Sequence, residues 1–441
     1  MSNNIISMAF HDPYRQSKYL RQTLSQDKKP VGFFVAAGCP LAIKMPADKW
    51  PLIPDVAGLT AFVSDAITKD TTVLPGGEKS ISDNYKLLAT ELKKAGLDHF
   101  NIEDLLSFVR GMKQVSAGAS DIRGFTEKNL SDIETLVCKK IVQKLRVSLP
   151  DNKTPYHNFA KWINNIERET AIEIFTTNYD LLLEEAFEQI GVPYFDGFVG
   201  SKQPFFDLRA VEDNKIPKHW SRIWKIHGSI NWYQKKNKEV YRSTSLEEED
   251  SYIIYPSHLK YDQSRKMPYL ALIDRLNKFL RQTSAVLIVC GYSFSDEHLN
   301  DTILNALKAN PTAMVIGLLY GNLTDKKEKI EDDVKIEITT IRYEQALRLA
   351  ENRFNLSIWT FDEAIIGGLR AKWYPIKKDY GEDENLANAI KVIIDKIKDQ
   401  EGNEIDAPPR YEFHISDFSI LGHFLQELIG KEQFKVEENG K

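Results

Sequence analysis

Three apolar runs, each ending in small or polar residues, constrain the fold of this chain more than any other feature. They are AIEIFTT at 171–177, which leads into Asn178, RIWKIH at 222–227, and SAVLIVC at 284–290, which leads into GYSFSDEH. Buried parallel strands read as short apolar runs, and open α/β sheets bind ligands at the carboxyl ends of their strands. The three runs therefore predict a parallel sheet that gathers polar side chains at one edge.

The rest of the chain supplies further strands and the helices to cover them. Apolar runs at 31–37 and 313–320 are typical of additional strands, and amphipathic segments lie between the runs. Strands that alternate with helices predict an α/β fold with a Rossmann-like parallel sheet and helices on both faces. Between about 80 and 168, apolar residues recur at spacings of three and four, which predicts a helical insertion. Asn101 and Ser131 are its predicted helix N-caps.

A length of 441 residues favours two domains, or one domain with a large insertion. We expect a catalytic domain over 1–375 and a C-terminal helical extension over 376–441, with a boundary in KKDYGEDENL. Two predicted helices in the extension, 385–398 and 417–430, are each apolar on one face. Such faces need burial. They predict a homo-oligomer, with docking on the chain's own sheet as the alternative.

The overall charge excludes some partners. A formal net charge of −5 gives no broad basic field, so direct binding to nucleic acid is not expected. The basic runs KKNK at 235–238 and DKKEK at 325–329 are bordered by acids and are interpreted as solvated loops. The N-terminus lacks a signal-peptide pattern, and no apolar run approaches the roughly 18 residues of a membrane span. We therefore expect a cytoplasmic protein with no membrane contact.

The cysteines bear on redox compartment and metal binding. Cys39, Cys138 and Cys290 lie far apart, and the chain has no CxxC pair. This pattern predicts no disulfide framework. It also predicts no four-cysteine structural zinc site, because such a site needs its thiolates.

Two predicted strand ends carry the first candidate residues. Gly38, in the turn AAGCPLAI at 36–43, allows a backbone to approach a diphosphate closely. Asn178 offers an amide that both donates and accepts hydrogen bonds, with a helix N-cap as its alternative role. Asp180 falls in the predicted first helical turn, where an acid is also favourable for local reasons.

The other two strand ends add a base and a second polar loop. His227 precedes Gly228, and an unperturbed imidazole can act as a base near neutral pH. Gly291 and Ser293 suit close approach to a phosphate or ribose. Asp296 begins the next helix, where it is expected either to accept hydrogen bonds from ribose hydroxyls or to cap that helix.

These motifs also carry a family resemblance. TTNYD, a KxHGSINW-like strand end and GYSFSDEH together resemble the sirtuin-like NAD-consuming domains of bacterial anti-phage defence proteins, over roughly 31–320. The resemblance implies that Asn178 holds the nicotinamide ribose and the attacking water, and that His227 is the catalytic histidine. It assigns NAD contact to Ala37, Gly38, Asp180, Gly228, Gly291, Ser293 and Asp296. The IPDVAG segment is similar to a sirtuin element, which makes Asp55 a partner of the nicotinamide amide.

The glycine turn departs from the family pattern. That pattern is Gly-Ala-Gly-Ala-Ser, whereas this chain has Ala36 at the first glycine, Cys39 at the second alanine and Pro40 at the serine. A side-chain contact at position 40 is therefore lost, and Gly38 is the position expected to keep a phosphate contact.

The resemblance implies an NAD hydrolase that releases nicotinamide and ADP-ribose, without zinc, and depletes NAD in abortive infection. It also implies a HerA-type hexameric ATPase as a partner. Two alternatives stay open: a module that binds ADP-ribose or NAD without turnover, and a nuclease effector of the same complex.

Overall fold

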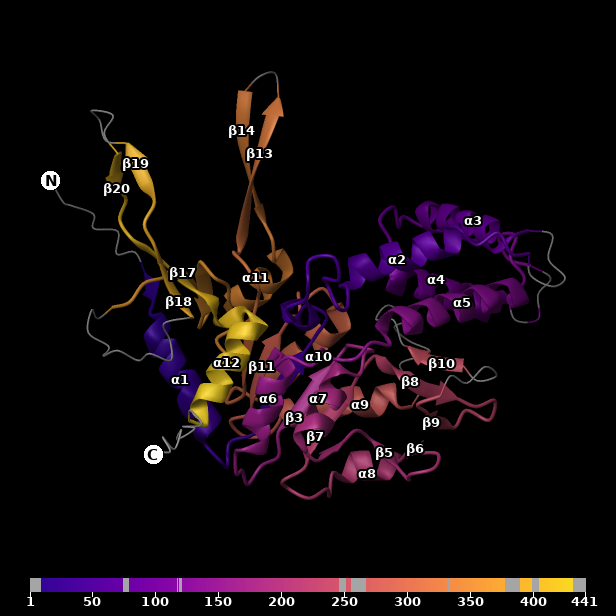
Figure 1. Cartoon of the computed structure of the whole chain (residues 1–441), viewed down its shortest axis with the longest axis horizontal. Coiled ribbons are helices and arrows are strands. Elements are labelled where there is room, and N and C mark those ends of the chain that lie inside the picture. Colours follow the sequence, from indigo (N-terminus) through magenta and orange to yellow (C-terminus); the bar gives the residue numbers. More distant parts are fainter. Residues whose placement is uncertain are drawn as a thin grey trace, which may run out of the picture.

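The computed structural model is an α/β protein built on one large sheet (Figure 1). It describes residues 9–73, 79–116, 118, 121–245, 251–254, 267–331, 334–376, 389–398 and 404–430.

The large sheet has ten strands in the order β1-β17-β16-β15-β12-β11-β2-β3-β7-β4. In that order they are β1 (Phe10–His11), β17 (Leu369–Trp373), β16 (Glu363–Ile366), β15 (Leu356–Trp359), β12 (Met314–Leu318), β11 (Val286–Cys290), β2 (Val31–Val35), β3 (Glu173–Thr176), β7 (Ser221–Lys225) and β4 (Tyr194–Phe195). Every pair from β15 to β4 is parallel, whereas β16 pairs antiparallel with both of its neighbours. The predicted parallel sheet is confirmed, with antiparallel pairing added near one edge.

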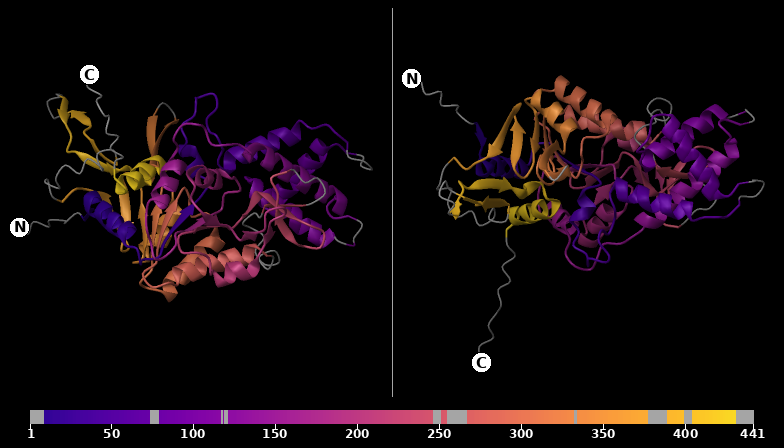
Figure 2. Two further views of the ribbon diagram at one scale, coloured as in Figure 1. Left: turned by 60° about the horizontal axis from the view of Figure 1, so that its bottom comes forward. Right: turned by 90° about the horizontal axis from the view of Figure 1, so that it is seen from above.

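Helices cover both faces of this sheet, as predicted (Figure 2). Strand β2 is buried along its whole length, and its residues alternate between two apolar cores. Phe33 lies in the core beneath α6 (Pro155–Asn164), α7 (Leu182–Ile190) and α12 (Phe418–Leu428). Phe34 lies in the core beneath α9 (Tyr269–Leu280) and α10 (Glu297–Ala309). Burial on both faces explains why the central strands read as continuous apolar runs.

Four helices between β2 and β3 confirm the predicted helical insertion: α3 (Ile81–Lys94), α4 (Ile102–Ser116), α5 (Glu127–Leu145) and α6. They follow α2 (Val56–Thr68), and α2 to α5 pack together beside the sheet (Figure 1). The Asn101 side chain accepts from the amides of Glu103 and Asp104, so its predicted capping role is confirmed. The prediction for Ser131 is wrong, because α5 begins four residues earlier and Thr126 caps it.

A smaller antiparallel sheet, built from strands on both sides of His227 in the sequence, was not predicted. Its strands are β10 (Ser251–Ile254), β8 (Gly228–Gln234), β9 (Val240–Arg242), β6 (Phe205–Phe206) and β5 (Phe198–Val199). The KKNK run at 235–238 lies between β8 and β9 and is largely exposed, as predicted. The DKKEK run is not a loop, because it lies in β13 (Thr324–Glu331), which pairs antiparallel with β14 (Val334–Ile341). That hairpin projects from the body of the molecule (Figure 1).

The C-terminal region corrects one predicted helix. Residues 390–398 form β18 (Ile390–Ile393) and β19 (Lys396–Lys398), which pair with β21 (Arg410–Phe413) and β20 (Glu404–Asp406). The helix predicted over 385–398 is therefore wrong from 390 onward. The run is rich in Ile and Val, which favour strands once a partner strand is present. Residues 385–388 and most of the predicted boundary lie outside the described residues.

The second C-terminal helix is confirmed as α12, and its apolar face is covered by this chain. Phe418 packs edge-on against Tyr156 of α6, with ring centroids 5.2 Å apart. Leu421 and Leu425 are fully buried, and Gly422 lies against the backbone of Pro155. The alternative of docking on the chain itself therefore holds for this helix, and its face gives no argument for self-assembly.

The remaining helices are α1 (Pro13–Ser25), α8 (Leu208–Asp213), α11 (Glu344–Glu351) and the short turns η1 (Cys39–Ala42) and η3 (His414–Ser416). Within the described ranges, no helix combines the length and the apolar character that a membrane crossing requires.

Candidate functional site

The predicted site residues follow four adjacent strands. The order β11-β2-β3-β7 places the segments after Cys290, Val35, Thr176 and Lys225 at the same edge of the sheet, because all three pairs are parallel and in register. The sequence prediction of one polar edge is therefore confirmed by the topology.

Two glycines allow the turns after β2 and β11 to cross. A Cβ atom on Gly38 would lie 2.8 Å from the Gly291 Cα, and one on Gly291 would lie 2.6 Å from the Cys39 nitrogen. Gly291 also has a φ of +68°, which favours glycine. The Gly38 amide donates to the Gly291 carbonyl at 2.9 Å, and the Cys39 amide donates to Ala36 at 2.9 Å. These donors are therefore engaged within the chain, and the phosphate contact expected of Gly38 stays a prediction.

Asn178 does not cap a helix. Helix α7 begins at Leu182, and its N-cap residue is Leu181, whose side chain makes no capping hydrogen bond. The backbone amide of Asn178 donates to the Thr176 hydroxyl at 3.0 Å. The residue is half-buried. The capping alternative is therefore wrong, and helix capping does not account for an asparagine at this position. We call residues 177–181 the Asn178 loop.

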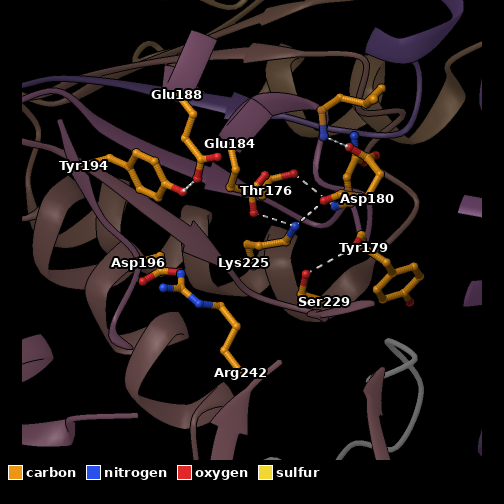
Figure 3. Close-up of polar contacts among 12 residues, drawn as sticks. Thr176, Tyr179, Asp180, Glu184, Glu188, Tyr194, Asp196, Lys225, Ser229 and Arg242 are labelled. Carbon is orange, nitrogen blue, oxygen red and sulfur yellow. Dashed lines mark hydrogen bonds and ion pairs between the residues drawn. The ribbon is translucent and has the colours of Figure 1, made fainter. Parts of the chain in front are cut away.

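Hydrogen bonds join this loop, and Thr176 directly before it, to residues 225–230, which we call the His227 segment. The Ile226 amide donates to the Thr176 carbonyl at 2.8 Å, and the Ile230 amide donates to the Tyr179 carbonyl at 3.0 Å. The Ser229 hydroxyl also donates to the Tyr179 carbonyl, at 3.3 Å (Figure 3). The two segments that carry the predicted catalytic residues are therefore held against each other.

A buried charged cluster lies beneath the Asn178 loop (Figure 3). The Lys225 side chain, 2 % exposed, donates to the Asp180 backbone carbonyl and to Glu184 Oε1, the latter at 2.8 Å. Asp180 is buried, and its Oδ1 accepts from the Leu182 amide at 3.0 Å. Burial raises the pKa of Asp180 to about 6, although Lys225 opposes that shift. Asp180 is thus part of the local structure, and its predicted contact with NAD is untested.

His227 faces Asp296. The residue is 3 % exposed, and its Nε2 lies 3.4 Å from Asp296 Oδ2. That separation is within ion-pair range but lacks regular hydrogen-bond geometry. The other carboxylate oxygen of Asp296 accepts from the amides of His298 and Leu299 and caps α10. Burial opposes ionisation of Asp296, but pairing with His227 and these two amides holds its pKa below the ordinary value.

The capping role that the sequence suggested for Asp296 is therefore confirmed, and the carboxylate also faces the predicted base. Because β7 and β11 are separated by β2 and β3, this contact passes over the carboxyl ends of both inner strands. Gly228, the first residue of β8, has a φ of +89° and makes the sharp turn after the histidine.

The loop from β11 to α10 is held by two residues that the sequence reading missed. Asn300 donates to the Phe294 carbonyl at 2.7 Å, and the Tyr292 hydroxyl donates to Asn300 Oδ1 at 3.0 Å. Phe294 has a φ of +59°, which is strained for a bulky residue. Ser293 is exposed, and its hydroxyl lies 3.0 Å from that of Ser295. Its side chain is therefore accessible, as ligand contact would require.

The helical insertion reaches the Asn178 loop. The Tyr179 hydroxyl donates to Glu103 Oε1 of α4 at 3.1 Å, and burial raises the pKa of Tyr179 well above its ordinary value. Another face of α4 borders a cleft of about 700 Å³. The cleft is lined by Leu97, Asp104, Ser107, Phe108, Gly111, Met112, Val115, Ile122 and Arg123, a set without any of the predicted site residues. Asp55 is exposed and caps α2 through the Gly58 amide at 2.8 Å.

Lys225 and Glu184 are the functional candidates that sequence reasoning missed. A detectable signal was present, because Lys225 interrupts an otherwise apolar strand run. A lysine is almost never fully buried without a charged partner. A lysine inside a predicted buried strand therefore predicts an acidic partner nearby, but the sequence does not reveal which acid it is.

Metal ligands and thiols add little to the site. Within the described ranges, no group of three or more His, Cys, Asp and Glu side chains is arranged to hold a metal ion. The three cysteines are free and buried, and burial raises the pKa of Cys138 to about 12.

Comparison with known protein families finds a match for one segment of the chain. Residues 172–339 match the SIR2-like domain. The match covers less than half of the chain but includes the Asn178 loop, the His227 segment and the loop after β11. It supports assignment of this segment to an NAD-dependent enzyme family. No curated protein matches the chain significantly.

This chain is similar to a chain from a solved structure of Sir2 enzymes, at 14 % sequence identity. The likeness covers 69 % of this chain and 85 % of the other. The TM-score of that likeness is 0.25, too low to carry an argument.

Proposed function

We propose that this protein hydrolyses NAD to nicotinamide and ADP-ribose at the carboxyl ends of β2, β3, β7 and β11. The observation that supports it most is the pairing of two segments by hydrogen bonds. One is the Asn178 loop, whose asparagine does not cap a helix, and the other carries His227, which faces a carboxylate. The match of 172–339 to a SIR2-like domain supports NAD as the substrate.

The proposed chemistry breaks the bond between the ribose C1′ and the nicotinamide nitrogen. Nicotinamide leaves as a neutral molecule with the bonding electron pair, through an oxocarbenium-like state at C1′. A water oxygen then bonds to C1′ and loses a proton. Asn178 orients the ribose and this water, and His227 accepts a proton as general base. Asp296 stabilises the imidazolium form of His227, because the carboxylate faces its Nε2.

A binding module without turnover is the second candidate, and one observation favours it. The amides of Gly38 and Cys39 already donate to carbonyls of the chain, and Pro40 has no amide to donate. A turn with few available donors weakens the expected grip on a diphosphate. A nuclease effector is the third candidate, and plasmid nicking with added divalent metal tests it.

We also propose the biological setting that the family resemblance implies. NAD hydrolysis would deplete the cofactor pool of an infected bacterium, with a HerA-type hexameric ATPase as partner and a homo-oligomeric assembly. The buried face of α12 does not contribute to that assembly argument. Sedimentation of the chain alone and with the ATPase tests both proposals, and a monomer that never binds the ATPase would contradict them.

The test of the activity is nicotinamide release by the purified chain and by its complex with the ATPase. Asn178→Ala and His227→Ala are each expected to lower turnover by about two to four decades, because positioned acid–base groups are worth that much. Their melting temperatures should stay close to that of the unmutated protein.

Asp296→Asn serves as a matched variant. Asparagine caps a helix as well as aspartate does, so α10 should keep its stability while turnover falls. Full turnover by His227→Ala would contradict the mechanism. NAD binding without any turnover by the unmutated complex would favour the binding module.

A further inference from the structure

Lys225 occupies a position that stability alone does not explain. It is the last residue of β7, and its side chain is almost completely buried. Burying a lysine and a glutamate costs desolvation energy, and well-packed apolar residues at such a pair are often as stable or more stable. Stability by itself therefore does not require this ion pair.

The contacts of Lys225 indicate a role for it. Its ammonium group donates to a backbone carbonyl of the Asn178 loop, that of Asp180, as well as to Glu184 on α7. Asp180 in turn fixes the first amide of α7, at Leu182. One ammonium group therefore fixes the end of the loop relative to both β7 and α7 (Figure 3).

We propose that Lys225 is a positioning residue that holds the Asn178 loop in the conformation needed to bind and hydrolyse NAD, with Glu184 as its counter-ion. This inference rests on the proposed function for its consequence on NAD. The backbone hydrogen bond from Ile226 fixes Thr176, directly before the loop, and the one from Ile230 fixes the middle of the loop. Lys225 fixes its far end. Loss of that last contact releases the loop without removing Asn178.

A second buried ion pair, at the opposite end of the neighbouring strand β3, gives a matched control. Arg275 Nη2 lies 3.0 Å from Glu173 Oε1, and both side chains are less than one-tenth exposed. Glu173 is the first residue of β3, whereas the Asn178 loop follows the last. Lys225→Met and Arg275→Met each remove a buried cation and strand a buried glutamate, but only the first touches the loop.

The experiment compares both variants with the unmutated protein at a temperature below all three melting transitions. Backbone hydrogen exchange of residues 177–182 reports loop opening without any need for NAD turnover. Lys225→Met is expected to speed this exchange at least tenfold, and Arg275→Met to leave it unchanged. Turnover should fall by about one to two decades in Lys225→Met with KM raised as well, because small misplacements of an orienting group cost that much.

Each outcome decides one proposal. Equal loop exchange and equal kinetic constants in the two variants would overturn the positioning role. Faster exchange in Lys225→Met, combined with no NAD turnover by the unmutated complex, would support the positioning role and contradict the proposed hydrolysis. If Lys225→Met does not fold, Glu184→Gln replaces it, because that variant keeps a hydrogen-bond acceptor and removes the counter-charge. If hydrogen exchange of residues 177–182 is the same in Glu184→Gln as in the unmutated protein, the positioning role of Lys225 and Glu184 is contradicted.

Discussion

The two ends of strand β3 use the same chemistry for different purposes. At its amino end, Glu173 accepts from Arg275 and from the Trp224 indole nitrogen at 2.7 Å, so side chains bind only side chains. Beside its carboxyl end, Lys225 of the neighbouring strand β7 binds Glu184 and also a backbone carbonyl of the Asn178 loop. The first cluster ties regular elements together, whereas the second fixes an irregular segment that no strand or helix ladder would hold.

The difference shows why a buried charge suits a loop. Backbone carbonyls in a loop lack the regular partners that helices and strands provide, so a buried one needs a donor from elsewhere. A lysine has three donors on a flexible stem and reaches such a carbonyl from a neighbouring strand. Its charge then requires an acid nearby, which Glu184 supplies.

The largest expected effect concerns the amino end of β3. Arg275→Met leaves the Glu173 carboxylate buried without its cation, and breaking a buried pair typically costs about 3–5 kcal/mol. The midpoint of urea unfolding should fall accordingly. The double variant Arg275→Met/Glu173→Leu should recover most of the loss but not all, because the Trp224 nitrogen then lacks its acceptor. If the double variant is as unstable as Arg275→Met, the loss does not come from the unpaired Glu173 carboxylate, and the structural role assigned to this ion pair is contradicted.

A smaller effect is expected at the carboxyl end, in the pH dependence of stability. The folded pKa of Asp180 is about 6, above its ordinary value of 3.8, chiefly because the group is buried. The folded protein therefore binds more protons than the unfolded chain between about pH 4 and 6, and Asp180 lowers stability as pH rises through that window.

Asp180→Asn removes this titration while keeping an acceptor for the Leu182 amide. Its free energy of unfolding, relative to the unmutated protein, should rise by up to about 3 kcal/mol between pH 4 and 7. A relative stability that stays constant over this range would show that the burial of Asp180 does not disfavour its charged form.

The smallest effect calibrates the role of burial. Lys69, the residue that follows α2, forms a pair with Asp65 of α2 at 2.7 Å, close to the 2.8 Å between Lys225 and Glu184. The side chains of Lys69 and Asp65 are 75 % and 62 % exposed. Lys69→Met is expected to change the free energy of unfolding by less than about 0.5 kcal/mol, since exposed pairs are worth little. A loss as large as that of Arg275→Met would contradict burial as the cause of the difference.

The sequence predicted the sheet better than the contacts that complete the site. Apolar runs reveal buried strands, and the shared edge follows from parallel pairing, so Asn178 and His227 were expected on one side. The acid that faces His227 was not predictable, because Asp296 follows another strand and only the fold brings the two together. The burial of Lys225 and its contacts were missed because they too depend on the fold, although its place in an apolar run is visible in the sequence.

Errors in the C-terminal region have a related cause. Residues 390–398 carry apolar residues at helical spacing, but their conformation is decided by pairing with the later strands β20 and β21. The spacing of apolar residues within one segment carries no information about such a partner strand. The same holds for β8, whose partners β9 and β10 follow it in the chain.

Strand β2 has a consequence for how this protein can be divided. The segment that matches a SIR2-like domain begins at residue 172, after β2, yet β2 lies between β3 and β11 and pairs with both. A fragment limited to 172–339 would carry two half-sheets, each with an unpaired edge that invites association with other chains. Neighbouring strands lie about 4.8 Å apart, so β2 also sets the spacing across which His227 and Asp296 meet. The matched stretch is therefore a unit of sequence similarity and not a unit of folding.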